Sequence, residues 1–509
     1  GKFDQFQKNI PYSALKQAFS GWIQYALSVK EEALLALRAQ LNDALGANAR
    51  VLIDFMDIFK VLLGELPAVA TLGAQETQNR FHLVIQRFIQ EITQQRPLVI
   101  FIDDLQWADR GTLNLLPQLM DSSSESKPCR LLLLVAYRDN EVDDSHPAMQ
   151  TLKQIQAEHS STNQPSTDHR ARTLTLNPLS HANINQLLVD ALHQNPKATD
   201  ALARLIEQKT DGNPFFINEF LKTLYSEKLL NFDLQHQRWL WSLNAIKAQG
   251  ITNNVVELML DKMHKLPNKT QQLLQLSSCI GSLFDLHTLS LISQQTMPDT
   301  VRTLWPALKE GLLLQEGGDW FLGMLGQRNM LQASISEPSK IIDQDDSQGL
   351  KQENERRRSP WVPRCKFLHD RMLQAAYESL SELARQAAHL RIGRLLLKHY
   401  AQADINEQLF AIIAQLNLGL SLIDTPQEKR QLAALNLQAA LQAKLASVWD
   451  AAVSYAYIGV DLLNETSWQT DYDLSFALHF AQVECEFLVS NHEQGQVLAE
   501  ALLERPIRL

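Results

Sequence analysis

The sequence predicts an α/β core built on a parallel sheet, followed by an all-α region that ends in helical repeats. Three observations lead to this fold class. Two short apolar runs, Leu98 to Ile102 and Leu131 to Tyr137, are typical of strands buried on both faces of a parallel sheet. Helical patterns alternate with such runs up to about residue 194, as in parallel α/β folds. Beyond that point almost every periodic segment is helical.

The first region, residues 1 to 194, combines both kinds of pattern. Before the first strand, helices are expected at Tyr12 to Val29, Lys30 to Leu45 and Gln75 to Gln94. After it we expect, in order, helix Thr112 to Met120, a Ser-rich turn at Ser122 to Ser126, strand Leu131 to Tyr137, helix Pro147 to Ala157, strand Arg172 to Leu176 and helix Ile184 to Leu192.

A helical region follows at residues 195 to 250. The helix Ala201 to Lys209 ends at Gly212-Asn213-Pro214, since glycine suits a helix C-terminus and proline the first turn of the next helix. That helix is expected at Phe215 to Lys228. The stretch Leu230 to Leu243, with Trp239 and Trp241 in alternation, indicates a hairpin.

Residues 251 to 371 form the third predicted domain, with a polar, irregular insertion at about 323 to 361. The expected elements are helices Asn254 to Lys265, Thr270 to Ile280, Leu286 to Ser293 and Val301 to Glu310, and strands Leu312 to Gln315 and Arg364 to Leu368. His369-Asp370 lies between a strand and a helix, and without a partner cysteine or histidine it is expected to start the helix.

The fourth predicted domain, residues 372 to 509, shows amphipathic helices in pairs, as in tetratricopeptide-like (TPR-like) arrays. Small residues at Ala440, Ala452, Ala456 and Gly459 allow close helix approach. The pairs are Leu435 to Leu445 with Trp449 to Leu463, and Leu474 to Leu488 with Gln494 to Leu503.

Composition excludes several classes of protein. The chain has 509 residues and a net charge of −10, which weighs against a phosphate-backbone binder. The four cysteines are far apart, so neither a zinc site nor a disulfide framework is expected. No apolar run approaches the roughly 20 residues that span a bilayer. These features favour a cytoplasmic protein.

The acidic pair Asp103-Asp104 follows the first predicted strand directly. In open α/β sheets ligands bind at the carboxyl ends of the strands, and a strand-end aspartate there can hold the Mg²⁺ of a nucleotide. Asp103 is the candidate Mg²⁺ ligand, and Asp104 the candidate that orients or deprotonates the attacking water. The alternative is an acidic pair that only caps the following helix.

Arg138 follows the second predicted strand. A cation at this edge can contact a γ-phosphate, although pairing with Asp139 or Glu141 on the surface is the simpler alternative. A nucleotide site of this kind also needs a Gly-rich loop that ends in Lys-Ser/Thr, and the sequence has none. Gly1-Lys2 is followed by Phe3 and is not such a loop. We therefore expect an internal segment of a longer protein, whose N-terminal strand-loop-helix unit lies upstream of Gly1.

Several ordered stretches resemble the STAND-class, AAA-related ATPase module of large bacterial signalling kinases. They are Gly1-Lys2-Phe3-Asp4-Gln5, Gln78-Asn79-Arg80-Phe81, Leu105-Gln106-Trp107-Ala108-Asp109, Tyr137 to Val142, Gly212-Asn213-Pro214-Phe215-Phe216, Ile251 to Leu258 and Phe367-Leu368-His369-Asp370-Arg371. The resemblance implies that Asp103 and Asp104 form the Walker B pair, that Arg138 is the sensor arginine and that Pro214 packs near the adenine. Gly212 and Asn213 belong to the same nucleotide-contacting motif.

The resemblance further implies ATP and Mg²⁺ as cofactors of the full-length protein, and a winged helix at residues 251 to 371. It places the module between kinase-like and sensor domains of the same chain. We expect protein partners on the helical repeats, nucleotide-dependent self-association, and little activity without the upstream loop. Two alternatives stay open: a non-catalytic interaction scaffold, and a winged-helix DNA-binding regulator of the same broad class.

Overall fold

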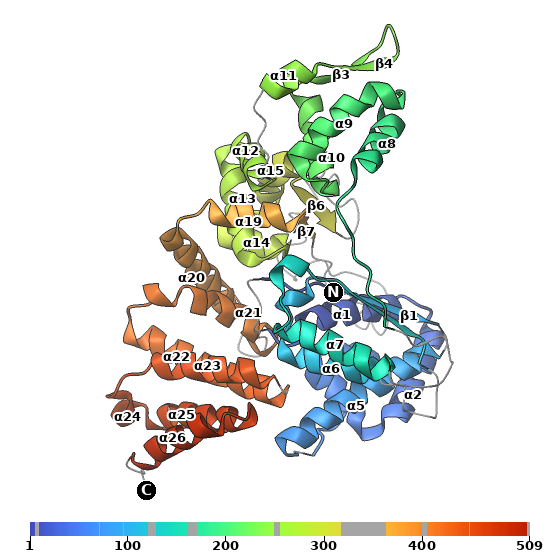
Figure 1. The fold of residues 1–509 in the computed structure, drawn as a ribbon. Helices are drawn as coiled ribbons and strands as arrows, with labels where there is room; N and C mark the ends of the chain where they lie inside the picture. The colour runs from blue at the N-terminus through green and yellow to red at the C-terminus, as the bar shows by residue number, and fades with distance from the viewer. Residues whose placement is uncertain are drawn as a thin grey trace, which may run out of the picture. The chain divides into compact units, whose positions relative to one another are not determined.

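The computed structural model describes residues 1–5, 10–70, 72–94, 96–120, 129–160, 171–248, 255–316, 363–399, 405–446 and 448–505. The chain divides into two compact units (Figure 1). Unit 1 joins Gly1–Arg172 with Gln386–Leu509, and unit 2 is Thr173–Arg385. The two units are defined by contacts between residues and not by whether their elements are helices or strands. The predicted boundaries near residues 194, 250 and 371 therefore stay predictions.

The sheet of unit 1 is small and parallel, as expected. Strands β1 (Leu98–Ile102) and β2 (Leu131–Val135) pair in parallel, with Val99 opposite Leu132 and Phe101 opposite Leu134. Lys2 forms a further parallel bridge with Asp103, just beyond the end of β1. The N-terminus thus lies beside the end of β1, on the edge away from β2.

Among the residues that the structure describes, one face of this sheet is covered and the other is exposed. Ile100 and Ile102 are buried, whereas Val99 and Phe101 are 57% and 50% exposed. On β2 the partners of these two residues, Leu132 and Leu134, are 53% and 45% exposed. The prediction that both strands are buried on both faces is therefore wrong for this face. Four large apolar side chains lie together on it.

Helices pack on the covered face because their apolar positions recur at helical spacing. The aromatic side chains of Phe19, Phe59 and Phe88 meet edge to face in this core. The helices are α1 (Ser13–Leu27), α2 (Glu31–Leu45), α3 (Arg50–Phe55), α4 (Ile58–Leu63), α5 (Ala74–Thr93), α6 (Arg110–Met120) and α7 (Pro147–Ser160), with the short 3₁₀ turns η1 (Gly46–Ala49), η2 (Leu105–Trp107) and η3 (Asp139–Glu141).

The predicted strand Arg172 to Leu176 does not form. The residues there have no regular structure, and Leu174 and Leu176 are 82% and 85% exposed. A strand needs a neighbour for its backbone groups, and alternating leucines do not supply one. The predicted turn at Ser122 to Ser126 lies outside the described residues.

The C-terminal part of unit 1 is helical throughout. Helix α22 packs on α23, α23 on α25 and α25 on α26. Ala440, Ala452 and Ala456 are buried, and a Cβ on Gly459 would approach Leu478 to 2.4 Å, so small residues do permit this packing. The helices are α20 (Glu382–His399), α21 (Ile405–Leu418), α22 (Pro426–Leu445), α23 (Trp449–Asp461), α24 (Ser467–Thr470), α25 (Tyr472–Leu488) and α26 (His492–Leu503), with the turn η4 (Leu420–Leu422).

Unit 2 begins with helices and a hairpin. Strands β3 (Leu230–Asp233) and β4 (Arg238–Trp241) are antiparallel, which confirms the predicted hairpin. The helices of this part are α8 (His181–Leu192), α9 (Pro196–Thr210), α10 (Pro214–Ser226) and α11 (Leu243–Ala248).

The rest of unit 2 combines helices with a small antiparallel sheet. The sheet has the order β5-β7-β6, with β5 (Leu283–Asp285), β6 (Leu313–Glu316) and β7 (Arg364–Phe367). Strand β5 was not predicted, because three residues are too short for a period-2 pattern. The helices are α12 (Val255–His264), α13 (Asn268–Ile280), α14 (Leu286–Ser293), α15 (Met297–Lys309) and α19 (Asp370–Glu378). The predicted insertion at 323 to 361 lies outside the described residues.

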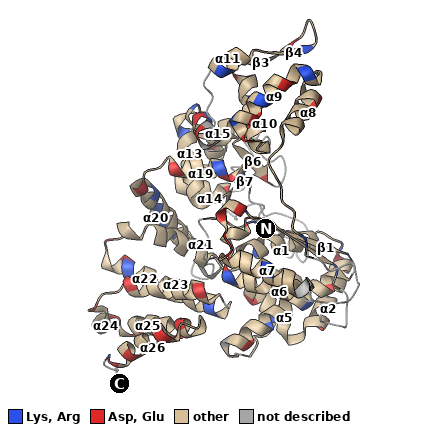
Figure 2. Ribbon diagram, in the orientation of Figure 1, with Lys and Arg blue, Asp and Glu red and all other residues tan. Residues whose placement is uncertain are grey.

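Two properties of the whole chain bear on function. Among the described residues, no helix has the length and apolar character needed to cross a membrane. Basic and acidic residues are interspersed over the ribbon (Figure 2), and acidic residues outnumber basic ones by 57 to 47.

Candidate functional site

The acidic pair lies where β1 ends, and its two carboxylates differ in exposure. The Asp103 side chain is 36% exposed, whereas that of Asp104 is 5% exposed. Asp104 adopts left-handed backbone angles, φ 55° and ψ 47°, which aspartate tolerates better than most residues. This conformation turns the chain from the strand into η2. The Asp103 carboxylate faces solvent while Asp104 lies inside.

Three side chains surround the Asp104 carboxylate. The Lys2 ammonium lies 2.9 Å from Oδ2, and Arg138 Nε lies 3.3 Å from Oδ1. Gln106 Nε2 donates to the same Oδ1 at 3.0 Å. A buried carboxylate needs such compensation, because leaving it unpaired would cost several kcal/mol. Asp104 is therefore held between two cations and an amide.

Arg138 lies beyond β2 and is itself fixed from three sides. Its Nη1 donates to Glu141 Oε1 at 2.9 Å, its guanidinium lies over the Trp107 ring at 5.1 Å, and its backbone N–H donates to Gln106 Oε1 at 3.3 Å. The surface pairing weighed as the alternative is thus present, together with the contact to Asp104. The structure brings Asp103, Asp104 and Arg138 together; their chemical roles stay predictions.

Lys2 is the residue of this site that the sequence did not reveal. Its ammonium also lies 3.8 Å from Asp103 Oδ2, so it faces both carboxylates. Local pattern excluded Gly1-Lys2 as a phosphate loop and suggested no other role. Only the parallel bridge between Lys2 and Asp103 places this cation beside the acidic pair. No signal in the sequence alone pairs these residues.

Asp109, five residues after Asp104, has a structural role. Its carboxylate accepts bonds from Thr112 N at 2.9 Å, Thr112 Oγ1 at 2.6 Å and Tyr12 N at 3.0 Å. Burial raises the pKa of Asp109, while these hydrogen bonds act in the opposite direction. The side chain starts α6 and ties it to the segment before α1. It does not reach the Asp104 cluster through any of these bonds.

The Gly212-Asn213-Pro214 motif belongs to unit 2. Asn213 Oδ1 accepts from Phe216 N at 3.1 Å and Pro214 begins α10, as the structural interpretation expects. Gly212 has φ +69°, and a Cβ there would lie 2.4 Å from the Leu179 carbonyl oxygen, so only glycine fits. The predicted contact of this motif with a nucleotide stays a prediction.

Unit 2 brings together two of the stretches that carry the family resemblance. The Phe215 ring, at the start of α10, stacks on His369 at 4.1 Å with an interplanar angle of 21°. His369 Nδ1 accepts from Arg371 N at 3.1 Å and so begins α19, as expected. The starts of α10 and α19 therefore meet in one place.

The residues present fit a nucleotide-borne Mg²⁺ rather than an all-protein metal site. Within the described ranges, no group of three or more His, Cys, Asp or Glu residues could hold a metal ion. Mg²⁺ is usually bound by one or two carboxylates together with water and substrate phosphates. The pair Asp103-Asp104 supplies that number of carboxylates.

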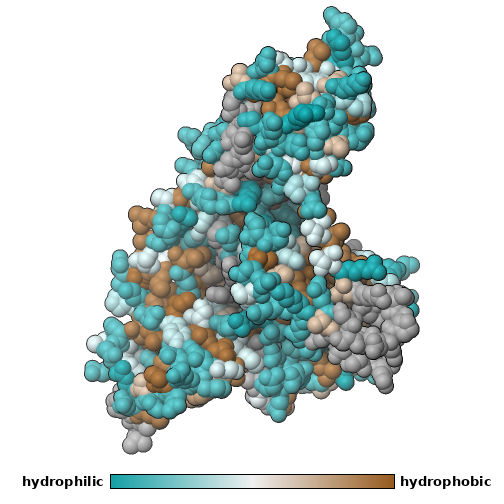
Figure 3. All heavy atoms as spheres, viewed as in Figure 1, coloured by the Kyte–Doolittle hydropathy of each residue, from teal (hydrophilic) through white to brown (hydrophobic). Residues whose placement is uncertain are grey.

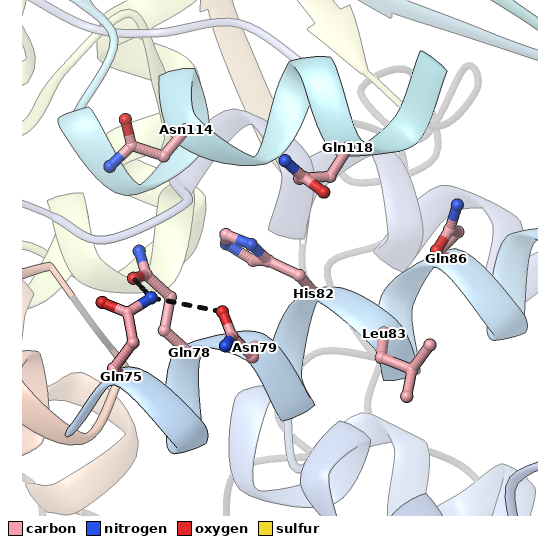
Figure 4. A pocket seen from close by; sticks show the side chains of 8 residues that line it. All are labelled: Gln75, Gln78, Asn79, His82, Leu83, Gln86, Asn114 and Gln118. Atoms are coloured by element: carbon pink, nitrogen blue, oxygen red, sulfur yellow. Dashed lines mark hydrogen bonds between the residues drawn. The ribbon is translucent and has the colours of Figure 1, made fainter. Parts of the chain in front are cut away.

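A separate pocket lies between α5 and α6 (Figure 4). It has a volume of about 530 Å³, and His82 projects from α5 toward α6 among six side-chain amides. Burial lowers the pKa of His82 to about 4, so the imidazole is neutral near pH 7. The lining thus lacks the positive charge that a phosphate needs. The lining residues are Gln75, Gln78, Asn79, His82, Leu83, Gln86, Asn114 and Gln118.

A family match covers the N-terminal part of the chain. Residues 1–135, which contain both acidic residues and all of β2, match the family described as an AAA ATPase domain. Such a domain implies nucleotide binding. Arg138 lies just beyond the matched range.

Two curated relatives are signalling kinases. The hybrid signal transduction histidine kinase G of Dictyostelium discoideum is 25% identical over 590 residues, which cover 99% of this chain and 16% of the relative. The peroxide stress-activated histidine kinase mak3 of Schizosaccharomyces pombe is 23% identical over 157 residues, 30% of this chain and 7% of the relative. The chain therefore spans a small part of each relative.

Among solved structures, a STAND signal-transduction ATPase with a tetratricopeptide repeat sensor from Pyrococcus horikoshii matches with a TM-score of 0.36 and 12% identity. The match covers 84% of this chain and 52% of that one. The sequence comparisons show that the first 135 residues of this chain match an AAA ATPase domain. They also show that the chain is a distant relative of a hybrid histidine kinase.

Proposed function

We propose that this chain is the ATP-dependent regulatory switch of a multidomain, cytoplasmic signal-transduction protein of the STAND class, coupled to a kinase or another output domain. The observation that carries the proposal is the cluster of Asp103, Asp104 and Arg138 at the carboxyl end of a parallel sheet, within and beside the stretch that matches an AAA ATPase domain. This edge is where α/β sheets bind nucleotides.

Each residue of the cluster has a role that suits its exposure. Asp103, the more exposed carboxylate, would hold Mg²⁺, which neutralises charge on the phosphates. Asp104 would orient the attacking water once its own cations are drawn away. Arg138 lies close enough to exchange Asp104 for a γ-phosphate, and would thereby report whether that phosphate is present.

The exposed face of the β1-β2 sheet supports the proposal that a further structural unit packs on it. Parallel sheets are normally covered on both faces, yet Val99, Phe101, Leu132 and Leu134 are exposed together. We propose that a strand-loop-helix unit N-terminal to Gly1 covers this face and supplies the Gly-rich phosphate loop. Crossover helices in such units pack on the sheet, and their N-termini bind phosphate. ATP binding by the chain without that unit is expected to be weak.

Unit 2 would respond to nucleotide through its first helices. The antiparallel sheet β5-β7-β6 with α13, α14 and α15 is the arrangement expected of a winged helix, and Phe215 stacked on His369 links it to α10. We propose that nucleotide contacts near Pro214 shift this pair of helix starts. A change in ligand contacts is then converted into a movement of packed elements.

The C-terminal helices would bind protein partners. Figure 3 shows hydrophobic side chains on the surface over this part of unit 1. Exposed large apolar side chains on α22 and α25 include Leu441, Leu445, Phe476, Phe480 and Phe487, which are 40 to 67% exposed. Exposed apolar patches mark interaction sites. Nucleotide-dependent self-association and contacts with kinase or sensor domains of the same protein are further proposals for this surface.

The experiment is ATP turnover by the protein extended to include the residues upstream of Gly1. We expect Asp103→Ala to lower kcat by roughly 100-fold, since it removes a ligand of the cation that stabilises the transition state. Asp139→Ala, at an exposed aspartate of η3, is the matched control and should retain turnover. Equal turnover in the wild type and in Asp103→Ala would contradict the metal assignment.

The outcome also separates the two alternatives. If the extended protein binds no nucleotide, the scaffold interpretation gains, because the exposed apolar surface of α22 and α25 remains. Binding to duplex DNA that weakens steeply with salt would instead support the winged-helix DNA reader.

A further inference from the structure

Lys2 occupies a defined position beside the acidic pair. Its backbone N–H donates to Gln17 Oε1 and its carbonyl accepts from Gln17 Nε2, both at 3.0 Å. Phe3 N donates to the Asp103 carbonyl at 3.2 Å, and Phe3 is buried. The backbone on both sides of Lys2 is therefore fixed, and side chains in register on neighbouring strands share one face.

The Lys2 ammonium lies in the position from which a cation contacts both carboxylates. It is 2.9 Å from Asp104 and 3.8 Å from Asp103, and the lysine side chain is 22% exposed. A divalent cation held by Asp103 would lie against a carboxylate that the Lys2 ammonium also faces. Two cations at one site repel each other, so the lysine and the divalent ion cannot both keep these contacts.

We propose that Lys2 is a positioning residue that holds Asp104 in the resting site and competes with the nucleotide-bound divalent cation for the acidic pair. Arrival of the cation displaces the ammonium from Asp104. The affinity for the cation is thereby set lower than the two carboxylates alone would give. This role rests on the proposed nucleotide function and adds a residue and a regulatory step to it.

The competition has a second consequence for Asp104. Its Oδ2 contacts Lys2, and its Oδ1 contacts Arg138 and Gln106. A carboxylate with both oxygens engaged by cations is a poor acceptor for a water proton. Displacement of Lys2 would free one oxygen for that task, so that metal loading and activation of Asp104 occur together.

The test is the affinity of Mn²⁺, measured by the electron paramagnetic resonance signal of the free ion. The protein is extended upstream of Gly1 and saturated with a non-hydrolysable ATP analogue. We expect Lys2→Met to bind Mn²⁺ about 3- to 10-fold more tightly, the effect of removing one partly exposed ion pair. Lys2→Arg should keep the wild-type affinity, because it keeps the charge.

Two controls make the result specific. Lys197→Met, at an exposed lysine of α9, should leave the affinity unchanged. Lys2→Gln is a second neutral variant, and thermal unfolding establishes that each protein is folded. A purely structural role would lower the affinity in both neutral variants.

The two proposals fail in different ways. If the wild type does not bind the non-hydrolysable ATP analogue, either with EDTA or with metal, the nucleotide function is wrong, and the role of Lys2 with it. If the analogue binds and Lys2→Met and Lys2→Gln have wild-type or weaker Mn²⁺ affinity, only the role of Lys2 is wrong.

Discussion

At the residue scale, the buried aspartates Asp104 and Asp109 differ in the partners of their carboxylates. Asp104 forms ion pairs with Lys2 and Arg138, whereas Asp109 accepts hydrogen bonds from the N–H and O–H groups of Tyr12 and Thr112. The side-chain cations beside Asp104 can move away when a ligand binds. The backbone N–H groups that bind Asp109 are fixed by the fold. The first aspartate is suited to a change of partner, and the second to permanent support of the loop between them.

Asp109→Ala should therefore lower stability. The substitution leaves the N–H groups of Tyr12 and Thr112 buried without an acceptor, at a cost of about 2 to 4 kcal/mol for the two together. Urea unfolding followed by far-UV circular dichroism measures the change. Asp139→Ala, exposed in η3, should stay within about 0.5 kcal/mol of the wild type. A similar small change for Asp109→Ala would contradict this role.

His82 should make unit 1 sensitive to mild acid. Burial lowers the pKa of His82 to about 4, from an ordinary value of 6.5. Between these values the unfolded chain binds a proton that the folded chain does not, so stability falls as pH decreases through this range. His82→Gln should reduce the loss of melting temperature between pH 7 and pH 4.5. His193→Gln, at an exposed histidine, should show the wild-type loss.

At the element scale, strand β1 has one face that is buried in the core of unit 1 and one face that is exposed. Ile100 is 4% exposed and Phe101 is 50% exposed, although they are adjacent. Because successive side chains point to opposite faces, the two residues report on the two faces of the sheet. They offer a direct test of the proposal that an upstream unit covers the exposed face.

Ile100→Ala should destabilise this chain by about 2 to 5 kcal/mol, and Phe101→Ala by much less. In the protein extended upstream of Gly1, Phe101→Ala should become as costly as a substitution in the core, about 3 to 5 kcal/mol. Chemical denaturation of each variant, compared with its own wild-type protein, gives these free-energy differences. An equally small effect of Phe101→Ala in both backgrounds would show that the upstream segment does not cover this face.

At the scale of the whole molecule, unit 1 is assembled from both ends of the chain. The Tyr12 hydroxyl donates to the Ala446 carbonyl at 3.1 Å, and Arg110 Nε lies 3.5 Å from Asp450 Oδ2. Gly111 fits between these contacts: a Cβ there would lie 2.6 Å from Val448 Cγ2 and 2.9 Å from the Tyr12 ring. The start of α6, directly after the acidic loop, thus packs on the C-terminal helices.

Gly111→Ala should loosen this packing, whereas Gly21→Ala should not. Both glycines are in helices, where alanine is favoured by up to about 1 kcal/mol, but a Cβ on Gly21 meets nothing within 4 Å. Hydrogen exchange should show reduced protection of α22 and α23 only for Gly111→Ala. If both variants have equal protection, the two ends of the chain do not depend on this contact.

Local features of the fold could be predicted well because their causes are local. The bounds of β1 and α14 match the predicted runs, and Asp103-Asp104 was recognised because an apolar strand precedes it. The position of Lys2 and the joining of two separate chain segments in unit 1 depend on contacts between distant residues. Such contacts leave no periodic pattern in the sequence. Arg172 to Leu176 shows the converse: a strand-like pattern forms no strand where its backbone has no partner.

The discontinuity of unit 1 has a consequence for how the protein is made. Roughly two hundred residues of unit 2 are synthesised between the two halves of unit 1. At about 5 to 20 residues per second, the first 172 residues spend roughly 10 to 40 s on the ribosome before their C-terminal partner helices emerge. During that interval the surface around Gly111 is bare. We therefore expect the chain to be most prone to aggregation at this stage of biosynthesis, before the C-terminal helices cover that surface.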